Sequence, residues 1–156
     1  MADRDTEELN VLPRDRCGAL ARRWQRALSG TSYVPLSARD VQARLRDLTE
    51  RFIAVLIADP FAPGAARETG AALVEMHFTQ PESLGHTLDV LGTQLLAELP
   101  APHLRMLEPR LAAALAELAT GFAAAMRATI LEEQESIRSA VVGAQQQAEE
   151  ALRDSE

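Results

Sequence analysis

The chain has 156 residues, enough for one domain with a buried core, and its net charge of −7 argues against a nucleic-acid phosphate backbone as a partner. All 16 basic residues are arginine, which is typical of a GC-rich bacterial genome. Cys17 is the single cysteine, so no intrachain disulfide forms and a reducing compartment is favoured. The N-terminus has no apolar segment, and the longest apolar run, 52–58, is far too short to span a membrane. We expect a cytoplasmic protein with no membrane partner.

Alanine and leucine dominate the chain, only 4% of the residues are aromatic, and the residues that favour strands form no alternating runs. The expected fold is therefore all-α, a helical bundle with a long C-terminal helix. Loop lengths do not decide between a globin-like arrangement and a simple bundle. Three parts are expected: a flexible lead-in over 1–12, a helical domain over 13–129 and a coiled-coil helix over 130–156.

Two amphipathic helices are predicted in the first third of the chain. The first begins at Pro13, which suits a first helical turn, and ends at Ser29-Gly30. The second begins at the N-cap Ser37 and ends at Asp59-Pro60. Val34-Pro35 predicts an extended connector between them, because a residue before proline avoids the α region. Their apolar faces comprise Cys17, Leu20, Trp24 and Leu28, and then Val41, Leu45, Leu48, Phe52, Val55 and Leu56.

Two more helices are predicted before residue 100. The third opens at Pro63-Gly64, and its Gly70 would let another helix approach closely. The fourth opens at Pro81 and ends at Pro100. Their apolar faces comprise Ala66, Gly70, Leu73, Val74 and His77, and then Leu84, Leu88, Leu91, Leu95 and Leu99.

The last predicted helix is unusually long. It starts near Pro102, with a kink or a restart expected at Pro109. From residue 110 to 156 there is no further proline, and an unbroken helix of this length is a rod of about 70 Å. Side chains as far as Met126 are large enough to pack on the other helices. Beyond Ile130 the apolar residues alternate three and four positions apart, which is the spacing of a heptad repeat.

We call this heptad stripe the seam. Alanine and glutamine at core positions make it weak, so its register can change at low cost, as a signal-carrying helix requires. The same segment carries seven acidic residues against two arginines. We expect a homodimeric coiled coil, and a partly frayed helix is the alternative. The seam comprises Ile130, Gln134, Ile137, Val141, Ala144, Ala148 and Ala151, with Leu152 beside its end.

No catalytic residues are predicted. Cys17 lies on an apolar helix face, where nothing favours a reactive thiolate. The P-loop, the dinucleotide-binding fingerprint and the Gly-x-Ser-x-Gly elbow are absent from the sequence. No metal site is predicted either. Glu82, His86 and Asp89 share a helix face but lie opposite the leucines, which is typical of a solvated polar face.

His77 has two interpretations. Its place on the apolar face of the third helix predicts that it is buried or lines a cavity, where an imidazole can bind haem or a metal. A buried histidine is more often a core residue bonded to a backbone carbonyl. A small-molecule pocket is the related hypothesis, although the same side chains, with the nearby Phe61, serve equally well as ordinary core. The candidate pocket residues are Trp24, Tyr33, Met76, His77 and Phe78.

Four short segments carry a resemblance to a known family. Together with Trp24 and Leu28, they resemble the N-terminal region that precedes the PAS, GGDEF and EAL domains of actinobacterial cyclic di-GMP signalling proteins. The likeness spans about residues 20–99, and the end of the chain, 151–156, is similar to the short helix that leads into a PAS domain. The segments are 31–41, 59–63, 73–79 and 87–92.

The resemblance implies a non-catalytic sensory and dimerisation module. Such a module regulates PAS, GGDEF or EAL domains downstream in the same polypeptide through its C-terminal helix, and the chain is expected to stop just before them. It supplies no catalytic residues, because the GGDEF and EAL motifs are absent from the sequence. Two alternatives stay open: a haem- or metal-binding globin-like sensor that uses His77, and a stand-alone adaptor that binds another protein through its acidic tail.

Overall fold

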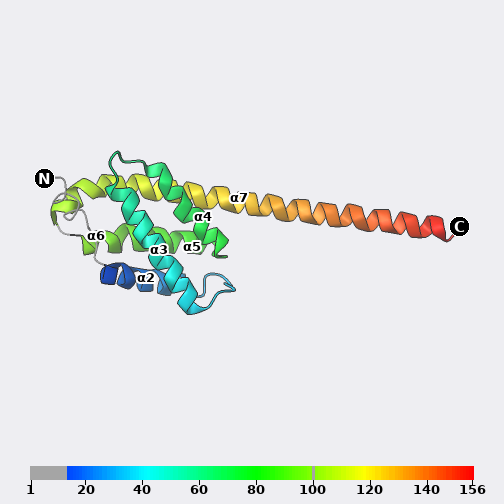
Figure 1. Ribbon diagram of the computed structural model, residues 1–156, viewed down its shortest axis with the longest axis horizontal. Coiled ribbons are helices and arrows are strands. Elements are labelled where there is room, and N and C mark those ends of the chain that lie inside the picture. The colour runs from blue at the N-terminus through cyan, green and yellow to red at the C-terminus, as the bar shows by residue number, and fades with distance from the viewer. Residues whose placement is uncertain (1–13, 100) are drawn as a thin grey trace.

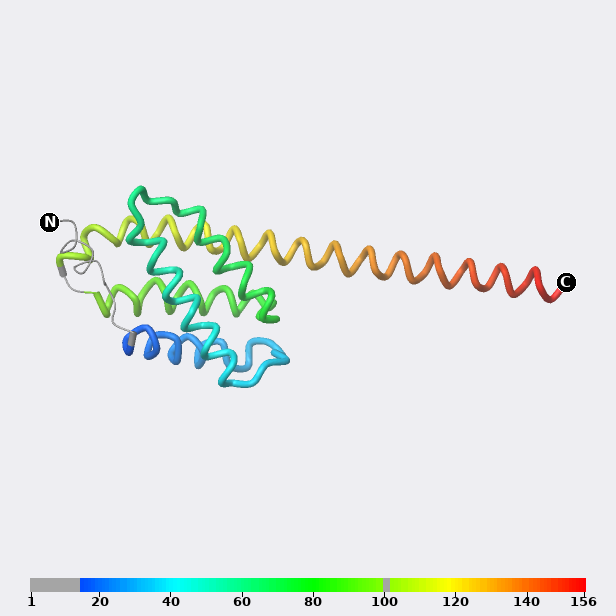
Figure 2. Tube along the Cα trace, viewed as in Figure 1, coloured from blue at the N-terminus to red at the C-terminus, as the bar shows by residue number. Residues whose placement is uncertain are grey.

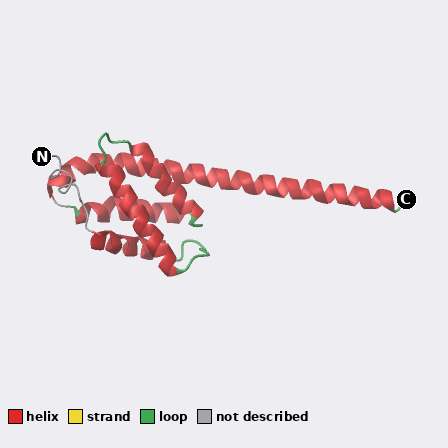
Figure 3. Ribbon diagram, in the orientation of Figure 1, coloured by secondary structure: helices red, strands yellow, loops and turns green. Residues whose placement is uncertain are grey.

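The computed structural model describes residues 14–99 and 101–156, without the side chains of Arg14 and Ala101. The expected lead-in and Pro13 lie outside the described residues. Every regular element in the described part of the chain is helical, which confirms the all-α prediction (Figure 3). The elements are α2 (Arg14–Leu28), α3 (Ala38–Ile57), the 3₁₀ helix η1 (Pro63–Ala66), α4 (Arg67–Glu75), α5 (Pro81–Asp89), the π-helical η2 (Val90–Gln94), α6 (Leu95–Glu98) and α7 (Ala101–Asp154).

The helices form a packed body and a projecting rod. Figure 1 shows α2 to α6 gathered with the first part of α7, while the rest of α7 extends away from them as one helix. The helix α4 packs chiefly on α7, and α2 packs on α3 and α5. The largest fully buried side chains come from every part of the body: Trp24, Phe52, Leu45, Leu73, Leu91 and Leu118.

Both ends of α3 are explained by specific hydrogen bonds. The Ser37 side chain accepts from the backbone N–H of Asp40 at 3.1 Å, so Ser37 is the N-cap that the sequence predicts. At the other end, Arg110 of α7 donates to the carbonyls of Leu56 and Ala58, both at 3.0 Å. These bonds satisfy carbonyls that a helix end leaves without intrahelical partners, and they tie α3 to α7.

Two glycines allow α4 and α7 to cross in backbone contact. A Cβ added at Gly70 would lie 2.6 Å from the amide nitrogen of Phe122, and one added at Gly121 would lie 2.6 Å from the Cα of Arg67. Both distances are far inside van der Waals contact. The crossing confirms the close approach expected at Gly70, and it fixes where α7 lies against the body.

The buried face of α5 differs from the prediction. Ser83 and Thr87 are buried there, whereas Leu84 and Leu88 are only partly buried. The π-helical turn of η2 explains this shift, because its extra residue rotates the face that follows relative to α5. Ser83 and Thr87 of α5 therefore lie on the same buried face as Leu91 and Leu95.

The helix α7 continues through Pro109, so it does not restart there. Pro109 lies on the exposed side of α7, where water can satisfy the carbonyl that loses its partner. The 54 residues of α7 correspond to a length of about 80 Å.

By length and composition alone, α7 could cross a membrane, and 22% of its most apolar window is buried within the structure. Core helices of soluble proteins pass the same test, so this is weak evidence for a span. Between Leu111 and Phe122 the apolar side chains of α7 pack on the body.

Candidate functional site

The seam lies on the part of α7 that leaves the body. Phe122 is the last buried residue of α7, and Ala125 and Met126 are partly buried against the core. From Ile130 onward every seam residue is exposed, including Ile137 at 65% and Leu152 at 66%. The trace in Figure 2 shows this segment running clear of the body. A row of large apolar side chains in water on a single helix is the feature of this chain that most needs an explanation.

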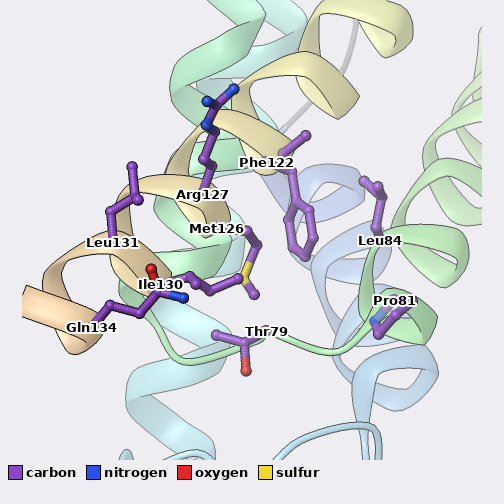
Figure 4. Close-up of a pocket in the computed structure, with 10 residues that line it drawn as sticks. Thr79, Pro81, Leu84, Phe122, Met126, Arg127, Ile130, Leu131 and Gln134 are labelled. Atoms are coloured by element: carbon purple, nitrogen blue, oxygen red, sulfur yellow. The ribbon is translucent and has the colours of Figure 1, made fainter. Parts of the chain in front are cut away.

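An apolar groove of about 580 Å³ lies where the rod meets the body. One wall is α7, and the other is the α4–α5 connection with the start of α5 (Figure 4). In that view Met126 and Ile130 extend from α7 toward the opposite wall, and Phe122 lies opposite Leu84. The lining residues are Thr79, Pro81, Leu84, Phe122, Ala123, Met126, Arg127, Ile130, Leu131 and Gln134.

The predicted small-molecule pocket is not assembled as expected. Trp24, Met76 and Phe78 are buried in the core, but Tyr33 is 90% exposed. His77 is also exposed, so the prediction that it is buried or lines a cavity is wrong.

The physical reason is that α4 ends before His77. Its φ is 69°, in the left-handed region, and the backbone N–H of Phe78 donates to the carbonyl of Leu73 at 2.9 Å. This is the hydrogen bond that closes a helix C-terminus in a Schellman motif. The helix therefore ends two residues before His77, and the imidazole points away from the apolar face.

A buried network of hydroxyl groups holds α5 to α2. The indole Nε1–H of Trp24 donates to Oγ1 of Thr87 at 2.9 Å, and that hydroxyl donates to the carbonyl of Ser83 at 2.8 Å. Oγ of Ser83 lies 2.8 Å from Oγ1 of Thr31 in the α2–α3 connection. Leucine periodicity concealed this network, because the sequence pattern assigned the core face of α5 to its leucines.

Replacing Thr87 with valine is expected to lower the free energy of unfolding by about 1–3 kcal/mol. Valine keeps the volume but leaves the buried indole N–H of Trp24 without a partner. Thr93→Val is the matched control, because Thr93 makes the same hydrogen bond to the carbonyl four residues earlier but is exposed. The control should stay within about 0.5 kcal/mol of the wild type in urea denaturation. Equal effects at both positions would contradict the role given to the indole bond.

The remaining candidate groups are the polar face of α5 and the thiol of Cys17. Glu82, His86 and Asp89 are all exposed on α5, as a solvated face requires. Residues 14–99 and 101–156 contain no group of three histidine, cysteine or carboxylate side chains placed to hold a metal ion. The thiol of Cys17 is buried, and desolvation, followed by the charge of Glu50, raises its pKa. The reactive thiolate is therefore disfavoured there.

Comparison with protein-family models, with curated proteins and with solved structures found no match. The candidate site is thus defined by the chain itself: the seam and the groove at its base. The seam follows from the spacing of residues in the sequence, whereas most of the groove residues were not predicted. One signal was present, because the seam spacing continues backward from Ile130 to Arg127 and Ala123.

Proposed function

We propose that the chain is a non-catalytic cytoplasmic sensor and dimerisation module whose α7 regulates an output domain. The output domain would be of the PAS, GGDEF or EAL type, in the same polypeptide. The observation that carries the proposal is the exposed seam on the projecting part of α7. Two copies paired along that seam would remove its apolar side chains from water.

The arrangement of charges supports a parallel pair. In the seam repeat, Ile130, Ile137 and Ala144 occupy d positions, whereas Gln134 and Val141 occupy a positions. Glu133 then falls at a g position and Arg138 at the following e position. Side chains at g and e of opposite helices form the salt bridges that set helix orientation. A parallel, in-register dimer places Glu133 of each copy beside Arg138 of the other.

The weakness of the seam supports a regulatory role. Ala144, Ala148 and Ala151 contribute little buried area, and Gln134 places an amide among apolar groups. Two registers of such a seam differ by few contacts, so a change in the body can select between them. A strong zipper, with leucine or isoleucine throughout, would resist that change.

A fusion tests the regulatory part of this proposal. Residues 1–156 are joined to a GGDEF diguanylate cyclase domain, with zero to seven residues inserted after Glu156. We expect the rate of cyclic di-GMP synthesis to vary with insert length and to return near its starting value at seven residues, one full heptad. Ala148→Pro, which interrupts α7 between the body and the insertion point after Glu156, should abolish the dependence on insert length. Activity that is the same at every length would contradict regulation through α7.

A further inference from the structure

The α7 wall of the groove is the backward continuation of the seam. Ile130 and Gln134 line the groove and also begin the seam. Stepping back along α7 by the same alternating spacing reaches Arg127 and then Ala123, and both of these residues line the groove as well. All four are exposed. The groove and the seam are therefore one continuous face of α7.

The opposite wall adds the large apolar surface that the seam lacks. Pro81 and Leu84 of α5 line one side of the groove, and Phe122 and Met126 of α7 line the other (Figure 4). A stable dimer interface buries about 1,200–2,000 Å² in total. A seam with three alanines and a glutamine contributes mainly through Ile130, Ile137 and Val141. An interface that also includes the groove gains the proline, leucine, phenylalanine and methionine side chains at its base.

We propose that the groove holds the same segment of α7 from a second copy of this chain. The inference rests on the proposed function, since it extends the dimer seam into the body. Each copy would place residues 123–134 of its α7 in the groove of the other, so the contact is isologous. A groove lined by apolar side chains beside one helix accommodates a second helix packed at about 8–10 Å.

Arg127 fits this arrangement. It falls at an a position of the continued repeat, and in Figure 4 its guanidinium extends away from Met126 and Ile130. The aliphatic stem can thus cover apolar surface while the charge stays in water. Polar residues at a positions specify register and oligomeric state at some cost in stability, and Gln134 is another such residue in this seam. Arg127 would act as such a residue at the base of the seam.

A partner helix in the groove would also couple the body to the seam. The groove wall formed by Pro81 and Leu84 belongs to α5, the helix that the Trp24–Thr87 hydrogen bond holds to α2. A helix seated in the groove contacts α5 directly. A shift of α5 in the body therefore changes the space available to the partner's α7.

The experiment combines a charge substitution with two cross-links. Pro81→Glu places a carboxylate in the groove, and an acid at the first turn of a helix is favourable, so α5 is preserved. Gln80→Glu adds the same charge at the neighbouring residue, which is exposed and does not line the groove. Dimer dissociation is measured by sedimentation, and circular dichroism confirms folding. Disulfide formation is compared for Arg127→Cys and Ala148→Cys, each in a Cys17→Ala background.

We expect Pro81→Glu to raise the dissociation constant on the order of tenfold, and Gln80→Glu to change it less than about twofold. Both Arg127→Cys and Ala148→Cys should cross-link. The inference would be overturned if Ala148→Cys forms a disulfide but Arg127→Cys does not, and if Pro81→Glu and Gln80→Glu give equal dissociation constants. The seam dimer would then remain intact. This is also the result expected if a small apolar ligand or another protein fills the groove. A wild-type chain that is monomeric would instead overturn the proposed function itself.

Discussion

Replacing Gly121 with alanine is expected to lower the free energy of unfolding by about 3 kcal/mol or more. The added Cβ would lie 2.6 Å from the Cα of Arg67 and closer still to its carbonyl oxygen. These are backbone atoms of α4, so no side chain can rotate to make room. The two helices must separate, and the core side chains on either side of the crossing lose contact. Thermal and urea denaturation of the purified variant measure the effect.

The same helix offers a control for Gly121→Ala. A Cβ added at Gly143 meets no atom within 4 Å, because this glycine lies on the projecting part of α7. Gly143→Ala should therefore leave the free energy of unfolding unchanged or raise it by up to about 1 kcal/mol, through helix propensity. If the two alanine variants unfolded alike, the backbone crossing of α4 and α7 would be wrong.

Replacing Ile137 with glutamate is expected to weaken the dimer by roughly a hundredfold or more. Ile137 is 65% exposed in the single chain and occupies a d position at the centre of the seam. Pairing two copies would bury an unpaired carboxylate from each, at a cost of a few kcal/mol. Sedimentation over a range of protein concentrations gives the dissociation constant.

Ser139→Glu is the control for this variant. Ser139 is exposed and lies two residues along α7, on the face opposite the seam. It gains the same charge, so general repulsion between acidic stalks affects both variants equally. Dissociation constants that are raised equally by the two substitutions would show that the seam is not the contact surface.

Much of the fold could be predicted because local signals agreed with packing. Ser37 caps α3 as expected, since capping depends on residues adjacent in the sequence. The core residues of α2 and α3 follow from helical spacing, and the projecting part of α7 follows from its uninterrupted helix formers. Gly70 also indicated a close crossing, although not which helix it meets.

The errors arose where a tertiary contact or a single residue changed the helical phase. The π-helical turn at 90–94 changes the helical phase between α5 and the leucines that follow it, so Ser83 and Thr87 of α5 are buried in place of its leucines. A left-handed residue ends α4 at His77, which moves the imidazole into solvent. A prediction that assumes a constant 3.6 residues per turn anticipates neither the π-helical turn nor the left-handed residue. The groove was missed for a different reason, since its two walls are some forty residues apart in the chain.

The central claim is that two copies pair in parallel along the seam of α7. Disulfide formation in Gln134→Cys and in Ala148→Cys tests it most directly, each in a Cys17→Ala background. The two positions occupy equivalent a positions, about 21 Å apart along α7. A parallel, in-register dimer cross-links at both, because a disulfide requires Cα atoms about 4.4–6.8 Å apart, and Ser139→Cys on the opposite face does not. An antiparallel pair cannot cross-link at both positions, and a monomer cross-links at neither, so either result would contradict the claim.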